Sequence, residues 1–404
     1  MQLDQAENLR SSDSDWRGLH RALALALAPL VALGFTRFAY ALLLPGMQAS
    51  LHWRLAEAGA LNTANAAGFL IGALSASALA AHWGTARVFT VSLVLSALCL
   101  LATGWLDSWA AFMVLRALGG LSTACAFVLG SALAPRAMPA RPGLALAIYF
   151  GGTGLGMMVA GLGWGLGQWL PSSQPWRAGW TFLGATALLA AAASGAAAWR
   201  MGKGAPPARH ESPPPAQPLR RLIGPTLAAN ALYGAGYVGY TTFVVALLAQ
   251  RGVGPTAGAL VFFAIGAASV LATPSWGRWL ERCRGGRGFA LVSLLLALSL
   301  LPVLLFTHLA AVAASAMLFG AVFMAGPAAV SVVAQRSLRT GDLARGLGAL
   351  TAAFSLGQSV GPLASGWLAD ATGLLESGLW LGPLLLMAGA VVSLAQKDVV
   401  GTSG

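Results

Sequence analysis

Long apolar segments follow one another along the whole sequence, and they limit the possible folds more than any other feature. Each contains about 20 residues, enough for one helix to cross a hydrocarbon core of roughly 30 Å. Only 9% of the 404 residues are charged and 57% are hydrophobic, whereas about a quarter of the residues in soluble domains are charged. The sequence therefore predicts an all-α polytopic membrane protein. We count twelve spans, at residues 20–48, 57–81, 87–106, 109–135, 143–170, 178–199, 222–249, 256–276, 288–306, 309–334, 346–369 and 377–395.

The sequence repeats part of its first half in its second half. The segment Gly34-x-x-Arg37-x-x-Tyr40 returns 200 residues later as Gly234-x-x-Tyr237-x-x-Tyr240. Internal repeats of this kind are typical of transporters whose binding site lies between two related halves. We therefore expect two pseudo-symmetric six-helix bundles. Farther along the offset is 205 residues, and Gly152, Gly156 and Gly161 correspond to Gly357, Gly361 and Gly366.

A proline-rich segment separates the two halves. Six prolines lie between residues 206 and 218, and such a segment is typical of an extended linker rather than a packed core. The other connections are short, which leaves no room for a soluble catalytic domain, so we expect no enzymatic activity. We predict an N-terminal tail at 1–18, a first bundle at 19–200, a linker at 201–220, a second bundle at 221–396 and a C-terminal tail at 397–404.

We expect neither a metal site nor a bound cofactor. The three cysteines, Cys99, Cys125 and Cys283, are scattered and odd in number, so they indicate neither a disulfide framework nor a metal cluster. The glycine pattern of the fifth span lacks the preceding strand that would give it meaning as a dinucleotide motif.

The net charge of +12 is a signal of topology. With both termini in the cytoplasm, nineteen of the 24 Lys and Arg residues lie inside, and only Arg54, Arg177 and Arg251 lie outside. This asymmetry sets orientation by the positive-inside rule. The basic charge thus predicts contact with the lipid bilayer and no nucleic-acid partner. The first span is too long for the apolar region of a signal peptide, so we expect a multi-pass protein of the bacterial inner membrane.

Three local patterns resemble motifs of the major facilitator superfamily. Arg116-Ala-Leu-Gly-Gly120 is similar to the pattern of that family's fourth helix, and the glycine-rich segment 151–167 is similar to its fifth-helix motif. The loop from Gly277 to Arg287 resembles its gating motif. In the corresponding loop of the first half, Ala81 stands where that motif has an acid. The resemblance implies a transporter that works by alternating access.

The resemblance also implies which residues act in gating and closure. In the first span, the segment from Gly34 to Met47 looks like the bacterial YbfB/YjiJ-like branch of the superfamily. We expect the gating and conformational residues to be Gly84, Arg87, Gly277, Glu281, Arg282, Gly152, Gly156, Gly357 and Gly361.

Two arginines lie within the predicted spans. Arg37 is about three residues from the centre of its span, or roughly 5 Å from the midplane. A guanidinium there costs about 2.5–3.5 kcal/mol on insertion scales and stays charged, so it must find a partner. One interpretation of Arg37 is a hydrogen-bond hub for helix carbonyls, and for Arg116 the structural alternative is that it organises helix packing or extends outward to the interface. The other interpretation, for either arginine, is a binding site for a substrate.

None of the twelve acidic residues lies in the middle of a span. Two buried cations without a buried carboxylate leave a site that needs an anion, and a substrate could supply it. The sequence therefore predicts a small organic anion, a carboxylate held by bidentate bonds from arginine. Glu57 begins the second span and Asp107 precedes the fourth, positions where the helix dipole favours an acid without any role in transport.

Three tyrosines lie in the seventh span, the first span of the second half, and two of them are near its middle. Tyr233, Tyr237 and Tyr240 are spaced so that they share one face of the seventh span. They could line a cavity or simply pack, and the asparagines and glutamine of the spans are more often contacts between helices than ligand contacts. We expect the substrate site to contain Arg37, Tyr40, Asn65, Arg116, Tyr149, Asn230, Tyr233, Tyr237, Tyr240 and Gln358.

The functional prediction is secondary active or facilitative transport of a small organic solute by a monomer. A coupled proton and an exchanged anion both remain open as the second partner, because no buried acid or histidine marks a proton path. One alternative is an efflux pump for drugs or metabolites with the same fold. Another alternative, from a different class, is a membrane sensor or scaffold that transports nothing.

Overall fold

The computed structural model describes residues 2–167, 174–201, 218–280, 282–338 and 340–397. These residues form helices joined by short loops, and this part of the chain contains no β-strand. Most of the predicted linker, residues 202–217, lies outside the described residues, as does Glu281.

The helices before the linker form a first bundle of six continuous segments. Its first segment is unbroken from Gln2 to Leu51, but its middle is a π-helix that begins directly after Pro29. The elements are α1 (Gln2–Pro29), η1 (Leu30–Phe38), α2 (Ala39–Leu51), α3 (Leu55–Trp83), α4 (Thr85–Thr103), α5 (Trp109–Ala137), α6 (Pro142–Gly167) and α7 (Pro175–Arg200).

The helices after the linker form a second bundle, also of six segments. Its fourth segment is interrupted at Met324, three residues before Pro327, a residue type that cannot complete the helical hydrogen-bond pattern. The elements are α8 (Leu219–Gln250), α9 (Pro255–Leu280), α10 (Arg287–Leu305), α11 (Leu309–Phe323), α12 (Ala325–Ser337), α13 (Thr340–Thr372) and α14 (Leu375–Leu394).

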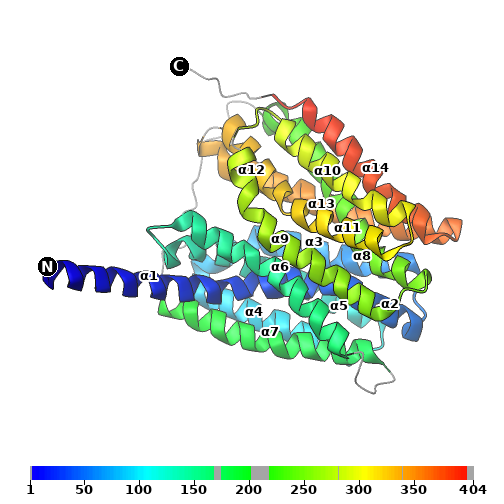
Figure 1. Ribbon diagram of the computed structural model, residues 1–404, viewed down its shortest axis with the longest axis horizontal. Coiled ribbons are helices and arrows are strands. Elements are labelled where there is room, and N and C mark those ends of the chain that lie inside the picture. Colours follow the sequence, from blue (N-terminus) through cyan, green and yellow to red (C-terminus); the bar gives the residue numbers. More distant parts are fainter. Residues whose placement is uncertain (1, 168–173, 202–217, 281, 339, 398–404) are drawn as a thin grey trace.

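Twelve helical segments in two bundles confirm the predicted fold class. Ten of the described segments are long and apolar enough to cross a membrane, and α9 has a shorter apolar part at 256–272. In Figure 1 α1 begins at the left and α14 runs from the right toward the upper left, so that both termini point to the same side, as an even number of crossings requires. Following the predicted orientation, we call the opposite end of the molecule the outer end. It holds the loops at 52–54, 104–108, 251–254 and 306–308.

Contact between the bundles runs along two pairs of helices. α6 packs against α9, and α3 packs against α13; α6 and α9 lie side by side at the front of Figure 1. A Cβ added at Gly154 of α6 would lie 2.7 Å from the Gly266 carbonyl oxygen, and one added at Gly59 of α3 would lie 2.5 Å from that of Pro362. Glycine permits these approaches, which replace the hydrophobic drive that helices lack in lipid.

The internal repeat of the sequence recurs as a repeat of packing. Gly152 lies against the Ala26 carbonyl, and Gly357 lies against the Ala231 carbonyl, so that a Cβ would fit at neither glycine. Gly357 follows Gly152 by 205 residues, and Ala231 follows Ala26 by the same 205 residues, the offset of the sequence repeat. Gly152 and Gly357 therefore join the fifth segment of each bundle to its first, whereas Gly161 and Gly366 lie against Ala259 and Leu55 of the other bundle.

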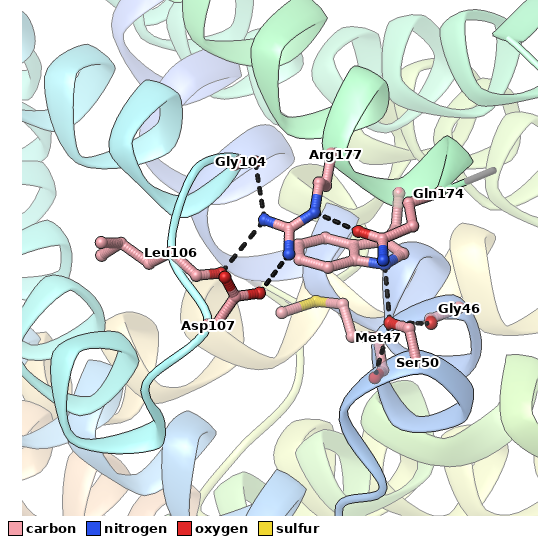
Figure 2. A network of polar contacts seen from close by, with 9 residues as sticks. Gly46, Met47, Ser50, Gly104, Leu106, Asp107, Gln174 and Arg177 are labelled. Atoms are coloured by element: carbon pink, nitrogen blue, oxygen red, sulfur yellow. Dashed lines mark hydrogen bonds and ion pairs between the residues drawn. The ribbon is translucent and has the colours of Figure 1, made fainter. Parts of the chain in front are cut away.

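An arginine ties together the outer end of the first bundle (Figure 2). Arg177, at the start of α7, bonds to the Gly104 and Leu106 carbonyl oxygens at 3.1 and 3.2 Å and pairs with Asp107 and Gln174. In the second bundle Arg251 bonds beside the equivalent loop, between the third and fourth segments. It donates to Val303 O at 2.5 Å and to Glu376 Oε1 at 2.8 Å. Each bundle thus holds its own outer loops.

Candidate functional site

Arg37 lies in the π-helix η1, close to the interface between the bundles. Its side chain is buried, with 7% of the residue exposed. π-helical turns are rare and occur often at functional sites. Beside Arg37, Phe38 meets Phe323 of the second bundle edge to face at 5.7 Å. The unusual backbone therefore places a cation against the other half of the molecule.

Within the described part of the chain, the Arg37 guanidinium has neither a hydrogen bond nor a carboxylate partner. Its neighbours are the ring of Phe69, whose centroid is 5.8 Å from Cζ, and Tyr237 of α8, with which it interacts electrostatically across the interface. A buried charge without a partner is costly. An anion that entered this site would remove that cost.

Tyr237 is joined to a second polar group of the same bundle. Gln358 of α13 donates from Nε2 to the Tyr237 hydroxyl at 3.0 Å, whereas its Oε1 is buried without a hydrogen bond. The ring of Tyr237 stacks on Phe354 with centroids 5.9 Å apart. Of the predicted site residues, the structure brings Arg37, Tyr237 and Gln358 together. Within the described part of the chain, the Arg37 guanidinium and Gln358 Oε1 have no hydrogen-bond partner.

Arg116 is the opposite case, because its guanidinium has several hydrogen-bond partners. It donates to Thr36 O at 2.5 Å, to Asn62 Oδ1 at 2.7 Å and to Leu61 O at 3.5 Å. Its Cζ also lies 4.4 Å from the centroid of the Tyr40 ring. Of the two interpretations open for an arginine in a span, the hub of hydrogen bonds describes the geometry of Arg116 and not that of Arg37.

The six other predicted site residues form hydrogen bonds within their own bundle. All six are buried, and a side-chain polar atom of each bonds to another helix of the same bundle. Whether any of them contacts a substrate stays a prediction. The bonds are Tyr40 to Ala58 O, Asn65 to Arg116 O, Tyr149 to Phe127 O, Asn230 to Leu350 O, Tyr233 to Phe323 O and Tyr240 with Ser315.

The residues predicted to act in gating lie near helix ends or in close helix contacts, and of the latter Gly357 directly precedes Gln358. Gly84 joins α3 to α4 with φ of 89°, a conformation that favours glycine. Arg87 and Arg282 are exposed, and Gly277 lies in α9. Gly156 and Gly361, like Gly152 and Gly357, pack inside one bundle: the nearest partners of Gly156 are Leu30 and Gly34, and that of Gly361 is Ala235.

Several residues at the interface were absent from the predicted site. Phe69 and Phe354 are ordinary members of apolar spans, so nothing in the sequence marked them. Asn62 was recognisable as part of an i, i+3 pair with Asn65, but Thr242, to which it donates at 2.5 Å across the interface, carried no signal. A hydroxyl within an apolar span becomes informative only when the facing helix is known.

A cavity of about 590 Å³ lies between the bundles near the outer end. Its walls come from both bundles and are mostly apolar, with Leu42 and Trp176 on one side and Val245 and Leu248 on the other. The volume is typical of a pocket for a small molecule. Arg37 is not among its lining residues, so the cavity and the buried arginine are separate features of this conformation.

The carboxylate of Asp370 joins the two bundles at the outer end. Its oxygens accept hydrogen bonds from the backbone N–H groups of Leu55 and Ala56 at 3.2 and 2.8 Å. These are the first residues of α3, where a helix has free N–H groups and a positive dipole end. The C-terminal part of α13 thus caps a helix of the other bundle.

Two bundles of six helical segments, with a buried cation near their interface, have the architecture of a polytopic membrane transporter of the major facilitator fold. The chain belongs to the family described as "Uncharacterised MFS-type transporter YbfB", whose pattern matches residues 29–394. The resemblance stated from the first span is thereby confirmed, and the family is one of transporters rather than enzymes. No curated protein matches the chain.

Solved transporters share the fold at low sequence identity. A D-xylose-proton symporter is 13% identical, with a TM-score of 0.73 over 94% of this chain and 97% of that one. The nucleoside transporter NupG is also 13% identical, with a TM-score of 0.68 over 93% and 97%. A bacterial homolog of the human lysosomal transporter Spinster, in an inward-facing and occupied conformation, is 16% identical, with a TM-score of 0.67 over 94% of each chain. These likenesses establish the architecture and leave the substrate to be argued from the site.

Proposed function

We propose that this protein transports a small organic monoanion, a carboxylate with an apolar body, by alternating access. The observation that supports the substrate class is the Arg37 guanidinium, which is buried and has no hydrogen-bond or acidic partner in the described part of the chain. A carboxylate would accept two parallel bonds from that guanidinium. Binding would then exchange an unpaired charge for an ion pair.

The charge of the second buried arginine favours a single negative charge on the substrate. Arg116 interacts electrostatically with Arg37, but its donors already meet Thr36, Asn62 and Leu61. It therefore adds positive potential without offering a free donor for a second carboxylate. One carboxylate at Arg37 would accept the free donors of that guanidinium and would also be attracted by the positive charge of Arg116.

The surroundings of the arginine favour an apolar or aromatic body for the substrate. The Phe69 ring lies 5.8 Å from the guanidinium carbon, and Tyr237, which interacts electrostatically with Arg37, stacks its ring on Phe354. Gln358, which bonds to Tyr237, offers one polar contact beside them. A sugar, with hydroxyl groups on every side, would find few partners here. Pockets of this kind bind ligands through apolar area and a few oriented polar groups.

Alternating access is supported by the position of Arg37 and Tyr237 on opposite bundles. A substrate held by both would be exposed to one side or the other as the bundles rock about it. We infer that the protein lies in a bacterial inner membrane with both termini inside, on the basis of the Lys and Arg asymmetry. Glu57 bonds to the backbone N–H of Arg54, and Asp107 pairs with Arg177; both thus have local partners at the outer end, away from a central proton path.

The test is stabilisation of the purified protein by candidate ligands. Benzoate, lactate, succinate, xylose and tetraphenylphosphonium would be added to wild type and to Arg37→Gln, and the Tm measured. A charge-assisted bond is worth about 1.5–3 kcal/mol, so we expect the variant to bind the preferred monoanion about 10–100-fold more weakly. Arg251→Gln is the control, because it removes an arginine that lies at the outer end and pairs with Glu376.

The proposal fails if the cation stabilises the protein best. It fails equally if an anion stabilises wild type and Arg37→Gln alike. Selective stabilisation by one monoanion, lost in Arg37→Gln and retained in Arg251→Gln, would support it. That anion would then be used in flux assays with proteoliposomes, where uptake distinguishes a transporter from a sensor.

A further inference from the structure

A buried chain of hydrogen bonds crosses from one bundle to the other beside the proposed anion site. Arg116 Nη2 donates to Asn62 Oδ1 at 2.7 Å, and Asn62 Nδ2 donates to Thr242 Oγ1 at 2.5 Å. Thr242 in turn donates to Val238 O of its own helix at 2.6 Å. Arg116, Asn62 and Thr242 are each no more than 6% exposed. The chain therefore joins α5 and α3 of the first bundle to α8 of the second, away from solvent.

The direction of every bond in this chain is determined by chemistry. A guanidinium has donors only, so the atom of Asn62 that faces Arg116 must be its carbonyl oxygen. The amide nitrogen must then face Thr242, whose hydroxyl accepts that bond and gives its own proton to a backbone carbonyl. No rotation of the Asn62 amide preserves both contacts. The Asn62–Thr242 bond can form only while the two bundles are together at this level.

The other end of the chain is the π-helix that carries Arg37. Arg116 Nη1 donates to the carbonyl oxygen of Thr36, the residue directly before Arg37, at 2.5 Å. In η1 the backbone bonds span five residues, as from the Ala39 N–H to Gly34 O, a rare form of helix that occurs often at functional sites. The bond from Arg116 holds one carbonyl of this π-helical segment. It therefore influences the direction in which Arg37 points.

We propose that Arg116 is a positioning residue for Arg37, and that the Asn62–Thr242 bond makes this positioning depend on closure of the bundles around the site. The inference rests on the proposed anion site and adds to it a reason for affinity to change during the cycle. When the bundles separate at this level, Asn62 loses its partner in α8. Arg116 then loses the fixed acceptor that orients it, and its bond to the π-helix changes with it. The site binds tightly when closed and releases when open.

The experiment follows the arginine side chains by NMR, with no substrate present. Full-length protein labelled with 15N-arginine would be placed in lipid nanodiscs, and the Nε–H signals of Arg37 and Arg116 assigned from Arg37→Lys and Arg116→Lys. Thr242→Val removes only the hydroxyl that accepts from Asn62. Thr241→Val is the matched control: Thr241 is also buried in α8, but its hydroxyl bonds to Val238 O of the same helix at 3.2 Å.

We expect Thr242→Val to shift the signals of both Arg116 and Arg37, and Thr241→Val to leave them in place. Thr242→Ser keeps a hydroxyl and should restore the wild-type signals; if Thr242→Val does not fold, Thr242→Ala takes its place. A shift of Arg116 alone would overturn the positioning role, and no shift of either would overturn the whole chain. Because no anion is added, these results stand whether or not the Tm experiment supports the anion site.

Discussion

Removal of the Asp370 carboxylate should shift the protein toward conformations that are open at the outer end. This side chain accepts bonds from the N–H groups of Leu55 and Ala56 in the other bundle. Loss of a helix cap of this kind costs about 0.5–2 kcal/mol. Because Asp370 is exposed to solvent, we expect the lower or middle part of that range, about 1 kcal/mol. The cost falls only on the closed form, since an open outer end separates α13 from α3.

A change of about 1 kcal/mol alters the ratio of open to closed forms about fivefold, and 2 kcal/mol alters it about thirtyfold. Glu376→Ala is the control for Asp370→Ala. Glu376 is also an outer acid, but its partner Arg251 lies in the same bundle. Rocking of the bundles leaves that pair intact, so its loss should not change the ratio.

The assay is the distribution of distances between two spin labels at the outer end. Trp105 and Leu309 lie in opposite bundles and are 76% and 64% exposed, so Trp105→Cys and Leu309→Cys provide the labels. Cys283→Ser removes the one partly exposed native thiol in the described part of the chain. Asp370→Ala should raise the fraction of long distances, and Glu376→Ala should not. Equal distributions in all three proteins, or equal shifts in both variants, would refute the role of Asp370.

Three further outcomes are expected. Gly154→Ala should destabilise the closed protein by about 1–3 kcal/mol, since its methyl would press on a carbonyl of α9, whereas Gly151→Ala meets no neighbouring atom within 4 Å and should leave the Tm unchanged. Tyr237→Phe should weaken binding of the preferred monoanion about tenfold, because the amide of Gln358 loses its partner. Burial raises the pKa of the Cys283 thiol, so less thiolate exists at neutral pH and maleimide labelling should accelerate about tenfold per pH unit from 7 to 9. An impermeant maleimide should reach this thiol in inside-out vesicles and not in intact cells, and the reverse would contradict the predicted orientation.

The fold could be predicted because the length and apolar composition of membrane-spanning helices can be read directly from the sequence. The repeated glycines even indicated which helices approach closely, as Gly152 and Gly357 do. The π-helix could not be predicted. It is a local backbone conformation with no mark in the sequence, and the Thr36 carbonyl within it accepts a bond from Arg116, 80 positions away. Likewise, the loop arginines Arg177 and Arg251 serve equivalent loops from non-equivalent positions, so the sequence repeat did not reveal them.

The site could be predicted only in part, because a buried polar group is defined by what faces it. The sequence placed Arg37 and Arg116 in spans but could not distinguish a cation with three acceptors from one with none. The hydroxyls of Tyr233 and Tyr240 looked like cavity groups, yet each meets an acceptor on a neighbouring helix. Their partners are 90 and 75 residues away in sequence. Only the packing of helices decides which donors are left for a ligand.

If a monoanion binds at Arg37 as proposed, the two buried arginines make the transport cycle sensitive to membrane voltage. An empty site holds two positive charges from Arg37 and Arg116, and a site loaded with a monoanion holds one. A charge that moves through the full potential changes in energy by about 2.3 kcal/mol per 100 mV. The electric field therefore acts more strongly on the empty protein than on the loaded one. With the predicted orientation, a potential that is negative inside would hold the vacant site toward the cytoplasm, so polarisation of the cell would favour loading of the proposed substrate from that side.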